Sequence, residues 1–286
     1  MPDTNRELAD FLRRARSAGD PTRAGLPQDD RVRRVKGLRR EEVALLAGVS
    51  TDYYTRLEQG RHITPSPSVL DTVARALDLD SVGREHLGHL VGANPSRAVR
   101  STPAVQRVRP GLYQLLAALE AVPAMILGRR TDILASNALA RALFSDFDAF
   151  RPRERNYARW LFLDDTARAL FVDWEVQARA AVENLRFDTG HDLDDRGTRE
   201  LVDELTERSR EFRQWWSEHR VYQRTFGSKR LRHPIVGELT VDYETLTLPG
   251  DSEQTLFMYT TQVGTSSHQA LDTLISWTQT GPRVPA

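Results

Sequence analysis

The chain has 286 residues, 40% of them hydrophobic, and its 40 Lys and Arg residues balance its 40 Asp and Glu residues. This length predicts two domains, and the balanced charge by itself indicates no class of partner. The sequence contains no cysteine, which excludes disulfides, thiolate metal ligands and a cysteine nucleophile. A charged N-terminus and the lack of a long apolar run predict neither a signal peptide nor a membrane span, so we expect a cytoplasmic protein without a membrane partner.

The segment Gly37–Arg61 predicts two short helices joined by a tight turn, after a first helix over Glu7–Arg16. Gly48 ends the helix Arg39–Ala47, because glycine takes the left-handed conformation without a Cβ penalty. Ser50 is a good N-cap for the helix that follows, from Thr51 to about Gln59. The residues expected to face the core of this pair are Val43, Leu46, Ala47, Tyr54 and Leu57. An ordinary helical hairpin and a helix-turn-helix, whose second helix enters the DNA major groove, both fit this pattern.

Further residues of this segment favour the helix-turn-helix. Its pattern resembles that of the phage-repressor-like, Xre-type family, which places its structural residues at the positions of Ala44, Gly48, Val49, Ser50, Tyr54, Leu57, Glu58 and Gly60. We expect Glu58 to pair with Arg13 or Arg16 of the first helix, in a structural role. Six of the ten residues in the run Arg31–Arg40 are basic. Such a run is more often a solvated surface, but this one leads directly into the helix pair, where DNA phosphates would lie.

The polar residues at the start of the second helix of the pair suit direct readout of bases. Arg56 can donate two hydrogen bonds to guanine, Asp52 can accept one from cytosine, and threonines can contact a thymine methyl group or a phosphate. In the Xre-type family the position of Arg40 contacts a phosphate, and we expect the same of its arginine neighbours. The complete set of expected DNA contacts is Arg39, Arg40, Ser50, Thr51, Asp52, Thr55, Arg56 and Arg61. One helix-turn-helix reads few bases, so we expect a homodimer on a palindromic double-stranded operator.

The remaining elements divide the chain into two expected domains, 1–92 and 111–286, joined by a proline-containing linker over 93–110. Helices over 68–77 and 83–91 complete five helices in the first domain. Expected strands in the second domain cover 124–127, 132–135, 221–225, 237–248 and 255–262, with Pro249 and Gly250 in the last turn. Expected helices there cover 111–119, 137–144, 155–162, 165–184, 198–218 and 271–277. Two strands, then helices, then three strands on one antiparallel sheet is the layout of a PAS-type sensor fold.

Four segments together resemble one family of bacterial regulators. They are GLRREEVALLAGVSTDYYTRLEQGR, PAMILGRRTDILASNALARALF, RNYARWLF and HPIVGELTVDYETLTLPG. The sequence is similar to the MmyB-like transcription regulators. This resemblance implies an all-α, five-helix, lambda-repressor-like DNA-binding domain followed by an α+β PAS-like domain. It also implies that the second domain binds a small hydrophobic, fatty-acid-like molecule, which composition and spacing do not show.

The motif RNYARWLF supplies the candidate ligand contacts. Arg159 and Asn156 can recognise a carboxylate, with Asn137 and His233 behind them. The complete set of expected ligand contacts is Asn137, Asn156, Tyr157, Arg159, Trp160 and His233. Aromatic residues that could line a cavity for the tail are Trp160, Phe162, Phe171 and Trp174. Two alternatives remain open, because aromatic residues at helical spacing often form plain core and Arg159 could simply pair with Asp164 or Asp165.

Other chemistry has little support in the sequence. His86 and His89 lie one helical turn apart, but no further ligand completes a metal site, since Glu85 is expected to point elsewhere. The acidic run at Asp192, Asp194 and Asp195 lacks the later residues of a calcium loop. No catalytic or nucleotide-binding motif is present, so we expect no enzyme activity, no metal and no cofactor apart from a bound fatty acid. The alternatives are a sensor that does chemistry and a regulator whose second domain senses a protein partner.

Overall fold

The structure is a computed structural model that describes residues 3–21, 37–61, 63–92, 106–190, 195–223, 225–248 and 251–280. The chain forms two compact units, and neither is continuous in sequence. The first unit comprises 1–103, 186–202 and 215–223, and the second comprises 104–185, 203–214 and 224–286. Several expectations lie outside the described residues, namely most of the loop 19–30, the basic positions 31–36, most of the linker 93–110, Asp192, Asp194, Pro249 and Gly250.

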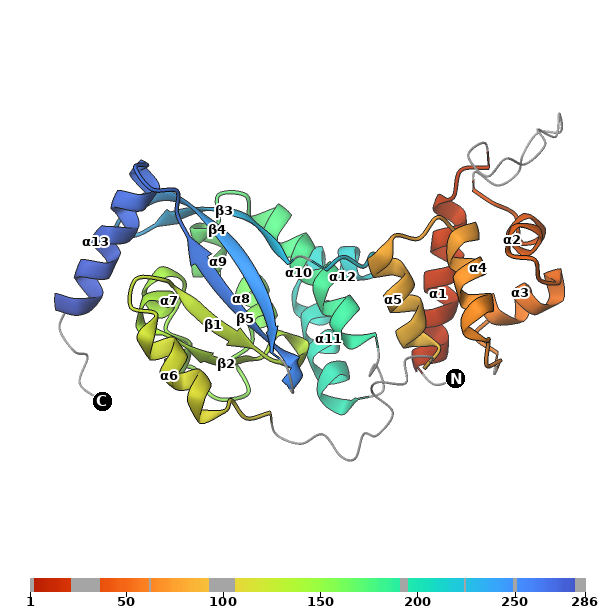
Figure 1. Cartoon of the computed structure of the whole chain (residues 1–286), viewed down its shortest axis with the longest axis horizontal. Helices are drawn as coiled ribbons and strands as arrows, with labels where there is room; N and C mark the ends of the chain where they lie inside the picture. Colours follow the sequence, from red (N-terminus) through yellow and green to blue (C-terminus); the bar gives the residue numbers. More distant parts are fainter. Residues whose placement is uncertain are drawn as a thin grey trace. The chain divides into compact units, whose positions relative to one another are not determined.

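The first unit contains the five expected N-terminal helices (Figure 1). They are α1 (Asp3–Ala18), α2 (Arg40–Ala47), α3 (Thr51–Glu58), α4 (Pro67–Ala76) and α5 (Ser81–Leu90). Their apolar faces meet in one core that includes Leu12, Val43, Tyr54 and Leu57. Leu46 was expected in this core and is 36% exposed, so that expectation was wrong. Ala44 takes the buried position instead, because a small side chain lets neighbouring helices approach closely.

Local signals fix the geometry of the turn between α2 and α3. Gly48 ends α2 in the left-handed region with φ +68°, and the amide of Tyr53 donates to Ser50 Oγ over 3.1 Å. Gly60, at φ +62°, follows α3. A Cβ at Gly60 would lie 2.1 Å from the carbonyl oxygen of Asn5, so this close approach to α1 admits only glycine.

The carboxylate of Glu58 joins three elements of the first unit. Arg16 donates to both of its oxygens, over 2.6 and 3.1 Å, and Arg40 Nε donates to Oε1 over 2.8 Å. Burial alone would raise the pKa of Glu58, but the hydrogen bonds and charges of Arg16 and then Arg40 outweigh burial and lower it. This confirms the expected pairing with Arg16, whereas Arg13 pairs with Asp10.

A second buried ionic cluster in the first unit was not expected from the sequence. Arg186, near the end of α10 (Trp174–Thr189), is fully buried and pairs with Glu7 of α1. Its guanidinium also donates to the carbonyl of Trp216, stacks on the ring of that residue and lies 3.0 Å from His219 Nδ1. Helices from the second half of the sequence therefore complete the core of the first unit. The expected domain boundary at the linker 93–110 stays a prediction.

The second unit is built on one antiparallel sheet with strand order β2-β1-β5-β4-β3 (Figure 1). The strands are β1 (Ala124–Leu127), β2 (Ile133–Ser136), β3 (Phe226–His233), β4 (Gly237–Leu248) and β5 (Asp251–Thr260). The helices outside the first unit are α6 (Pro110–Ala118), α7 (Ala138–Leu143), α8 (Tyr157–Leu163), α9 (Asp165–Leu170), most of α10, parts of α11 (Arg196–Arg208) and α12 (Arg210–Trp216), and α13 (Ser266–Thr280). This arrangement confirms the expected α+β domain. No helix in the described ranges is both long and apolar enough to cross a bilayer.

Three expected elements of the second half were wrong. The expected helix 165–184 is interrupted at Phe171–Asp173, because the amide of Val172 donates to the carbonyl of Arg230 on β3 over 3.0 Å. The expected helix 198–218 is interrupted at Ser209, whose Oγ accepts the amide of Phe212. The strand expected at 221–225 lies at Phe226–His233 instead, and Val221 packs against the core of the first unit.

Glu58→Gln should destabilise the first unit, because it leaves Arg16 and Arg40 without their shared negative charge. Breaking a buried ion pair costs about 3–5 kcal/mol. Hydrogen exchange of peptides from α1 and α3, measured on the full chain by mass spectrometry, would show this as faster exchange. Glu41→Gln is the control, because Glu41 is exposed on α2. Equal exchange in the Glu58→Gln protein and the wild type would contradict the structural role of Glu58.

The first unit should lose stability in mild acid because it buries neutral histidines. Burial lowers the pKa of His86 to about 3, with smaller contributions from His89 and His219. Since the unfolded pKa is about 6.5, protonation favours the unfolded chain, and each pH unit below 6.5 costs about 1.4 kcal/mol per such histidine. Relative to the intrinsic exchange rate at each pH, the protection of α1 and α5 peptides should fall between pH 6.5 and 5, and His86→Phe should reduce that fall. His268→Asn, in the second unit, should leave it unchanged.

Candidate DNA interface and ligand-binding interior

The start of α3 presents polar side chains to solvent, as the sequence predicted. Thr51, Asp52 and Arg56 are exposed and Thr55 is half-buried, while Tyr54 and Leu57 on the opposite face are buried. The capping hydroxyl of Ser50 is also on this exposed side of the turn. This placement leaves the first turn of α3 available to a DNA groove, and the base contacts themselves stay predictions.

The arginines expected to contact phosphates flank the same helix pair. Arg40 is the first residue of α2, and its side chain is 44% exposed although its guanidinium pairs with Glu58. Arg39 is half-buried at the N-cap of α2, with Nη1 3.8 Å from Glu41 Oε1. Arg61 is exposed directly after α3. Arg39 and Arg40 thus lie at the start of α2, and Arg61 lies just after the end of α3. Phosphate contacts at these positions would orient α3 on the DNA.

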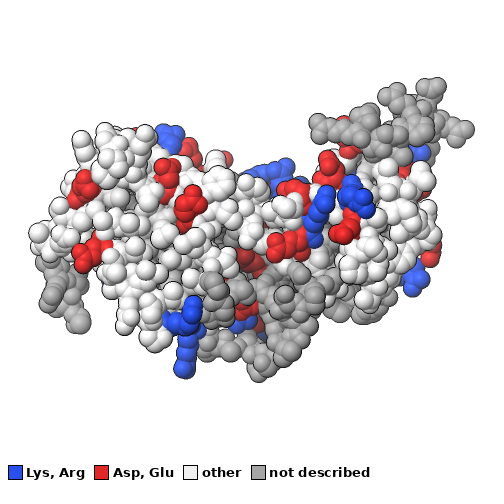
Figure 2. Space-filling view, viewed as in Figure 1, with Lys and Arg blue, Asp and Glu red and all other residues white. Residues whose placement is uncertain are grey.

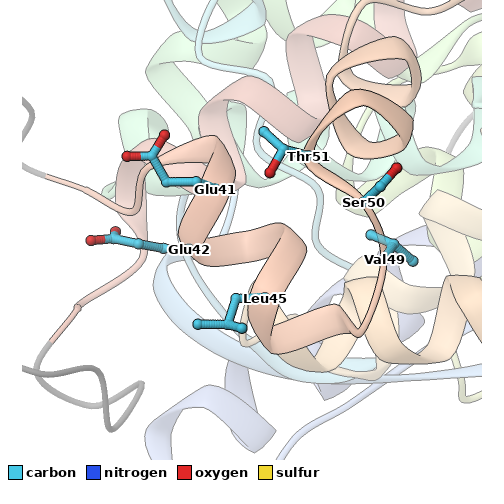
Figure 3. Close-up of a pocket in the computed structure, with 6 residues that line it drawn as sticks. All are labelled: Glu41, Glu42, Leu45, Val49, Ser50 and Thr51. Atoms are coloured by element: carbon cyan, nitrogen blue, oxygen red, sulfur yellow. The ribbon is translucent and has the colours of Figure 1, made fainter.

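A shallow pocket of about 400 Å³ lies between α2 and the start of α3 (Figure 3). Its lining residues are Glu41, Glu42, Leu45, Val49, Ser50 and Thr51. Glu42 accepts the backbone amide of Arg39 over 2.7 Å and so caps α2. Two carboxylates make this pocket unfavourable for a phosphate, so any phosphate contact has to come from the arginines beside it.

The charge on the face of the molecule that Figure 2 shows is mixed rather than concentrated. The face of the molecule in Figure 2 carries basic and acidic side chains interspersed, without one broad basic area among the described residues. This agrees with the equal numbers of basic and acidic residues in the whole chain. α2, α3 and the residues that flank them carry four arginines, Arg39, Arg40, Arg56 and Arg61.

In the second unit, two asparagines expected at the ligand have capping roles. Asn156 Oδ1 accepts the amide of Arg159 and caps α8, while Nδ2 donates to the carbonyl of Arg130 and to Asp132 Oδ1. Asn137 Oδ1 accepts two backbone amides and caps α7, while Nδ2 donates to two carbonyls. The hydrogen-bonding capacity of both amides is used inside the protein. A ligand role for either stays a prediction.

The expected anchor Arg159 pairs with Glu204, whose Oε2 lies 2.6 Å from Nε, and it also donates to the carbonyl of Arg153. The carboxylate partner is therefore on α11, and neither Asp164 nor Asp165 is the partner that the sequence suggested. His233 Nε2 lies 2.9 Å from the carbonyl of Ala142, and Nδ1 accepts the amide of Ile235. These contacts join α8 to α11 and β3 to α7, and ligand contact by either residue stays a prediction.

Tyr157 and Trp160 differ from the other candidates because they are buried without satisfied polar atoms. Neither Tyr157 Oη nor Trp160 Nε1 has a hydrogen-bond partner. Their rings lie 5.7 Å apart, within an aromatic cluster that includes Phe144, Phe147 and Phe171. Burial, then the neighbouring Tyr243, raises the pKa of the Tyr157 phenol, which keeps it a hydrogen-bond donor at neutral pH. By contrast, Trp174 Nε1 donates to the carbonyl of Leu161 and behaves as core.

Lys229 is a buried cation that the sequence reasoning did not select. It lies on β3 at an inward-facing position and donates to Gln177 Oε1 over 3.0 Å. The alternation of β3 could have revealed it, because Lys229 shares a face with Leu231 and His233. The strand expected at 221–225 ends before this alternation begins.

The histidine pair of α5 is also buried. His86 and His89 contact the ring of Phe187, and His89 Nε2 lies 3.6 Å from Glu85 Oε1. Glu85 therefore turns towards His89, contrary to the expectation that it points elsewhere. Within the described ranges no group of three metal-ligating side chains comes together.

Comparison with known proteins gives two family matches. Residues 7–87 match the model of a helix-turn-helix domain, and residues 108–274 match the model of the MmyB-like transcription regulator ligand binding domain. No curated protein matches the sequence. The helix-turn-helix match contains α2 and α3, and the second match contains the whole five-stranded sheet. Because the ligand-binding match covers more than half of the residues, the chain belongs to the family of MmyB-like transcription regulators.

Proposed function

We propose that the protein is a sequence-specific regulator that inserts α3 into the DNA major groove. The observation that carries this proposal is the exposed, polar first turn of α3 on a helix pair whose opposite face is buried. Arg56 and Asp52 have the side-chain chemistry to read guanine and cytosine edges, and Thr51 and Thr55 suit a thymine methyl group or a phosphate. In this proposal the protein acts in the cytoplasm by binding DNA and a ligand, and no residue is assigned a catalytic role.

Phosphate contacts come from Arg39, Arg40 and Arg61 in this proposal. The pairing of Arg40 with Glu58 supports it, because a guanidinium held by a buried carboxylate is already oriented before DNA arrives. Orientation in advance reduces the side-chain entropy lost on binding. These contacts position α3 and carry no sequence information themselves.

The proposed assembly is a homodimer on an inverted-repeat operator. A helix of eight residues contacts only a few base pairs, which is too few to select one site in a genome. Two copies related by a two-fold axis double the contacted sequence, with half-sites about 34–36 Å apart from centre to centre.

The second unit is proposed to sense a small, hydrophobic, fatty-acid-like ligand without a metal or cofactor. Its aromatic interior suits a hydrocarbon tail, and the unsatisfied donors of Tyr157 and Trp160 suit a polar head group. Among the residues expected at the ligand, we propose direct contact for these two. We propose that Asn137, Asn156, Arg159 and His233 maintain the surrounding loops.

Operator selection from a random DNA pool tests the function as a whole. The full chain should enrich an inverted repeat, and addition of cellular lipid extract should change the amount of DNA retained on that repeat. Light scattering of the complex should give two chains per operator. Enrichment of no common sequence would contradict sequence-specific binding, and an unchanged response to lipid would favour a protein partner as the signal.

Arg56→Ala and Arg40→Ala should affect DNA binding differently. Arg56→Ala should relax preference at one base pair per half-site, at a cost of about 1–3 kcal/mol there. Arg40→Ala should weaken all sequences alike and reduce the slope of log K against log salt by about one per chain. Arg84→Ala, an exposed arginine on α5, is the control. Unchanged base preference in the Arg56→Ala protein, measured by repeating the selection, would rule out this orientation of α3.

A further inference from the structure

One helix of the second unit, α6, carries no charged side chain. Its sequence over Pro110–Ala118 is PGLYQLLAA. Every other helix of eight or more residues in the described ranges contains at least one Asp, Glu, Lys or Arg. A helix that is apolar all round is normally buried on all sides. The surroundings of α6 therefore show whether the chain itself covers it.

Only one side of α6 is covered within the chain. Leu112 and Leu116 pack against the sheet, in a buried cluster with Ala124 and Leu256 (Figure 1). The opposite side is exposed, and we call it the outer face of α6. It consists of Tyr113, Gln114, Leu115, Ala117 and Ala118. Tyr113 is 52% exposed and Leu115 is 42% exposed, so two large apolar side chains meet water on a helix that has no charge.

The strand β4 adds a further apolar side chain on the sheet face that α6 covers. Leu246 pairs in register with Leu256 of β5, and cross-strand partners lie on the same face of a sheet. Leu256 is buried together with residues of α6, whereas Leu246 is 50% exposed. The uncovered apolar surface on this side of the unit therefore includes a sheet residue as well as a helix. Exposed apolar surface that gathers on one side of a soluble domain marks an interaction site.

The charges at the two ends of α6 favour a second copy of the same chain as the occupant of this surface. Arg109 directly precedes α6 and Glu120 follows it, and both side chains are exposed. Two α6 helices packed antiparallel about a two-fold axis near Gln114 bring Arg109 close to Glu120 of the partner subunit, once at each end. This pairing is additional to the contacts that Arg109 makes within its own chain. Exposed ion pairs add little affinity, but they select one orientation.

We propose that the outer face of α6 forms the dimer interface of this protein, with α6 of a second copy packed antiparallel on it. The inference rests on the homodimer of the proposed function and specifies the surface that forms it. A two-fold interface places central side chains near their own copies, so a centre without charge avoids repulsion between like charges. Nine residues give a helix only about 14 Å long, so we expect a dimer that dissociates on dilution and that DNA with two half-sites strengthens.

Single-cysteine variants of the full chain test this interface, because the sequence contains no cysteine. Gln114→Cys, at the middle of α6, should form a covalent dimer on mild oxidation. Helix axes about 8–10 Å apart allow the two Cα atoms at this position to approach within the roughly 4.4–6.8 Å that a disulfide requires. Glu120→Cys is the matched control, because antiparallel packing places its two copies at opposite ends of the pair. Absence of the dimer at position 114, or equal cross-linking at both positions, would overturn the proposed interface.

Sedimentation velocity of the full chain over a range of concentrations gives an independent readout. Tyr113→Glu and Ala117→Glu each place like charges across the two-fold axis, so each should weaken dimerisation by about tenfold or more. Val176→Glu is the control, on an exposed apolar position of α10 in the same unit, and should dimerise as the wild type does.

Unchanged dimerisation in both α6 variants would overturn the α6 interface and leave the homodimer intact. A wild type that sediments as a monomer at every concentration would also overturn this interface. One chain per operator in light scattering of the DNA complex would overturn the homodimer of the proposed function as well.

Discussion

The geometry of the helix-turn-helix depends on one buried carboxylate. Glu58, the last residue of α3, receives hydrogen bonds from Arg16 of α1 and Arg40 of α2. One side chain therefore fixes the ends of three helices relative to each other, and it does so on the side of α3 opposite to the exposed residues. Since Arg40 is also the proposed phosphate contact, the group that stabilises the fold orients the group that meets DNA.

The N-terminal helices were predictable because their signals are local. Gly48, Ser50 and Gly60 each specify a backbone conformation within a few residues. The periodicity of the apolar residues predicts which face of each helix is buried. Exposure of Thr51, Asp52 and Arg56 followed from the same helical spacing. The expectation for Leu46 failed because periodicity alone does not show how much of the apolar face of α2 its neighbours cover, and Leu46 lies outside the part made by Val43, Ala44 and Ala47.

The second half was less predictable because long-range contacts decide its breaks. Nothing local interrupts the helical pattern at Phe171, and the helix stops there because the backbone of Val172 bonds to β3. The partners of the expected ligand contacts also depend on long-range contacts that no local pattern shows. The sequence pattern of Arg159 fits a carboxylate anchor, and the carboxylate that it pairs with in the structure belongs to Glu204, 45 residues away in sequence. Tyr157 of α8 and Lys229 of β3 are far apart in sequence, and no local pattern shows that they meet.

The two binding regions have different internal balances of donors and acceptors. Around α3 the buried charges are paired within the protein, so that region is complete before DNA binds. Around Tyr157 and Trp160 the donors outnumber the acceptors that the protein supplies to them. The first region therefore suits a preformed reader, and the second suits a site whose stability rises when an acceptor enters.

The buried position of Arg186 has a practical consequence for dividing the protein. A fragment that ends at residue 92 would retain all five N-terminal helices and lose Arg186, Trp216 and His219. Glu7 would then lack its guanidinium partner, and the rings of His86 and His89 would lose their contact with Phe187. Chimeras that exchange sensory halves between relatives should therefore carry the matching residues of α1 and α5 with the donated half, rather than joining the parts at the linker alone.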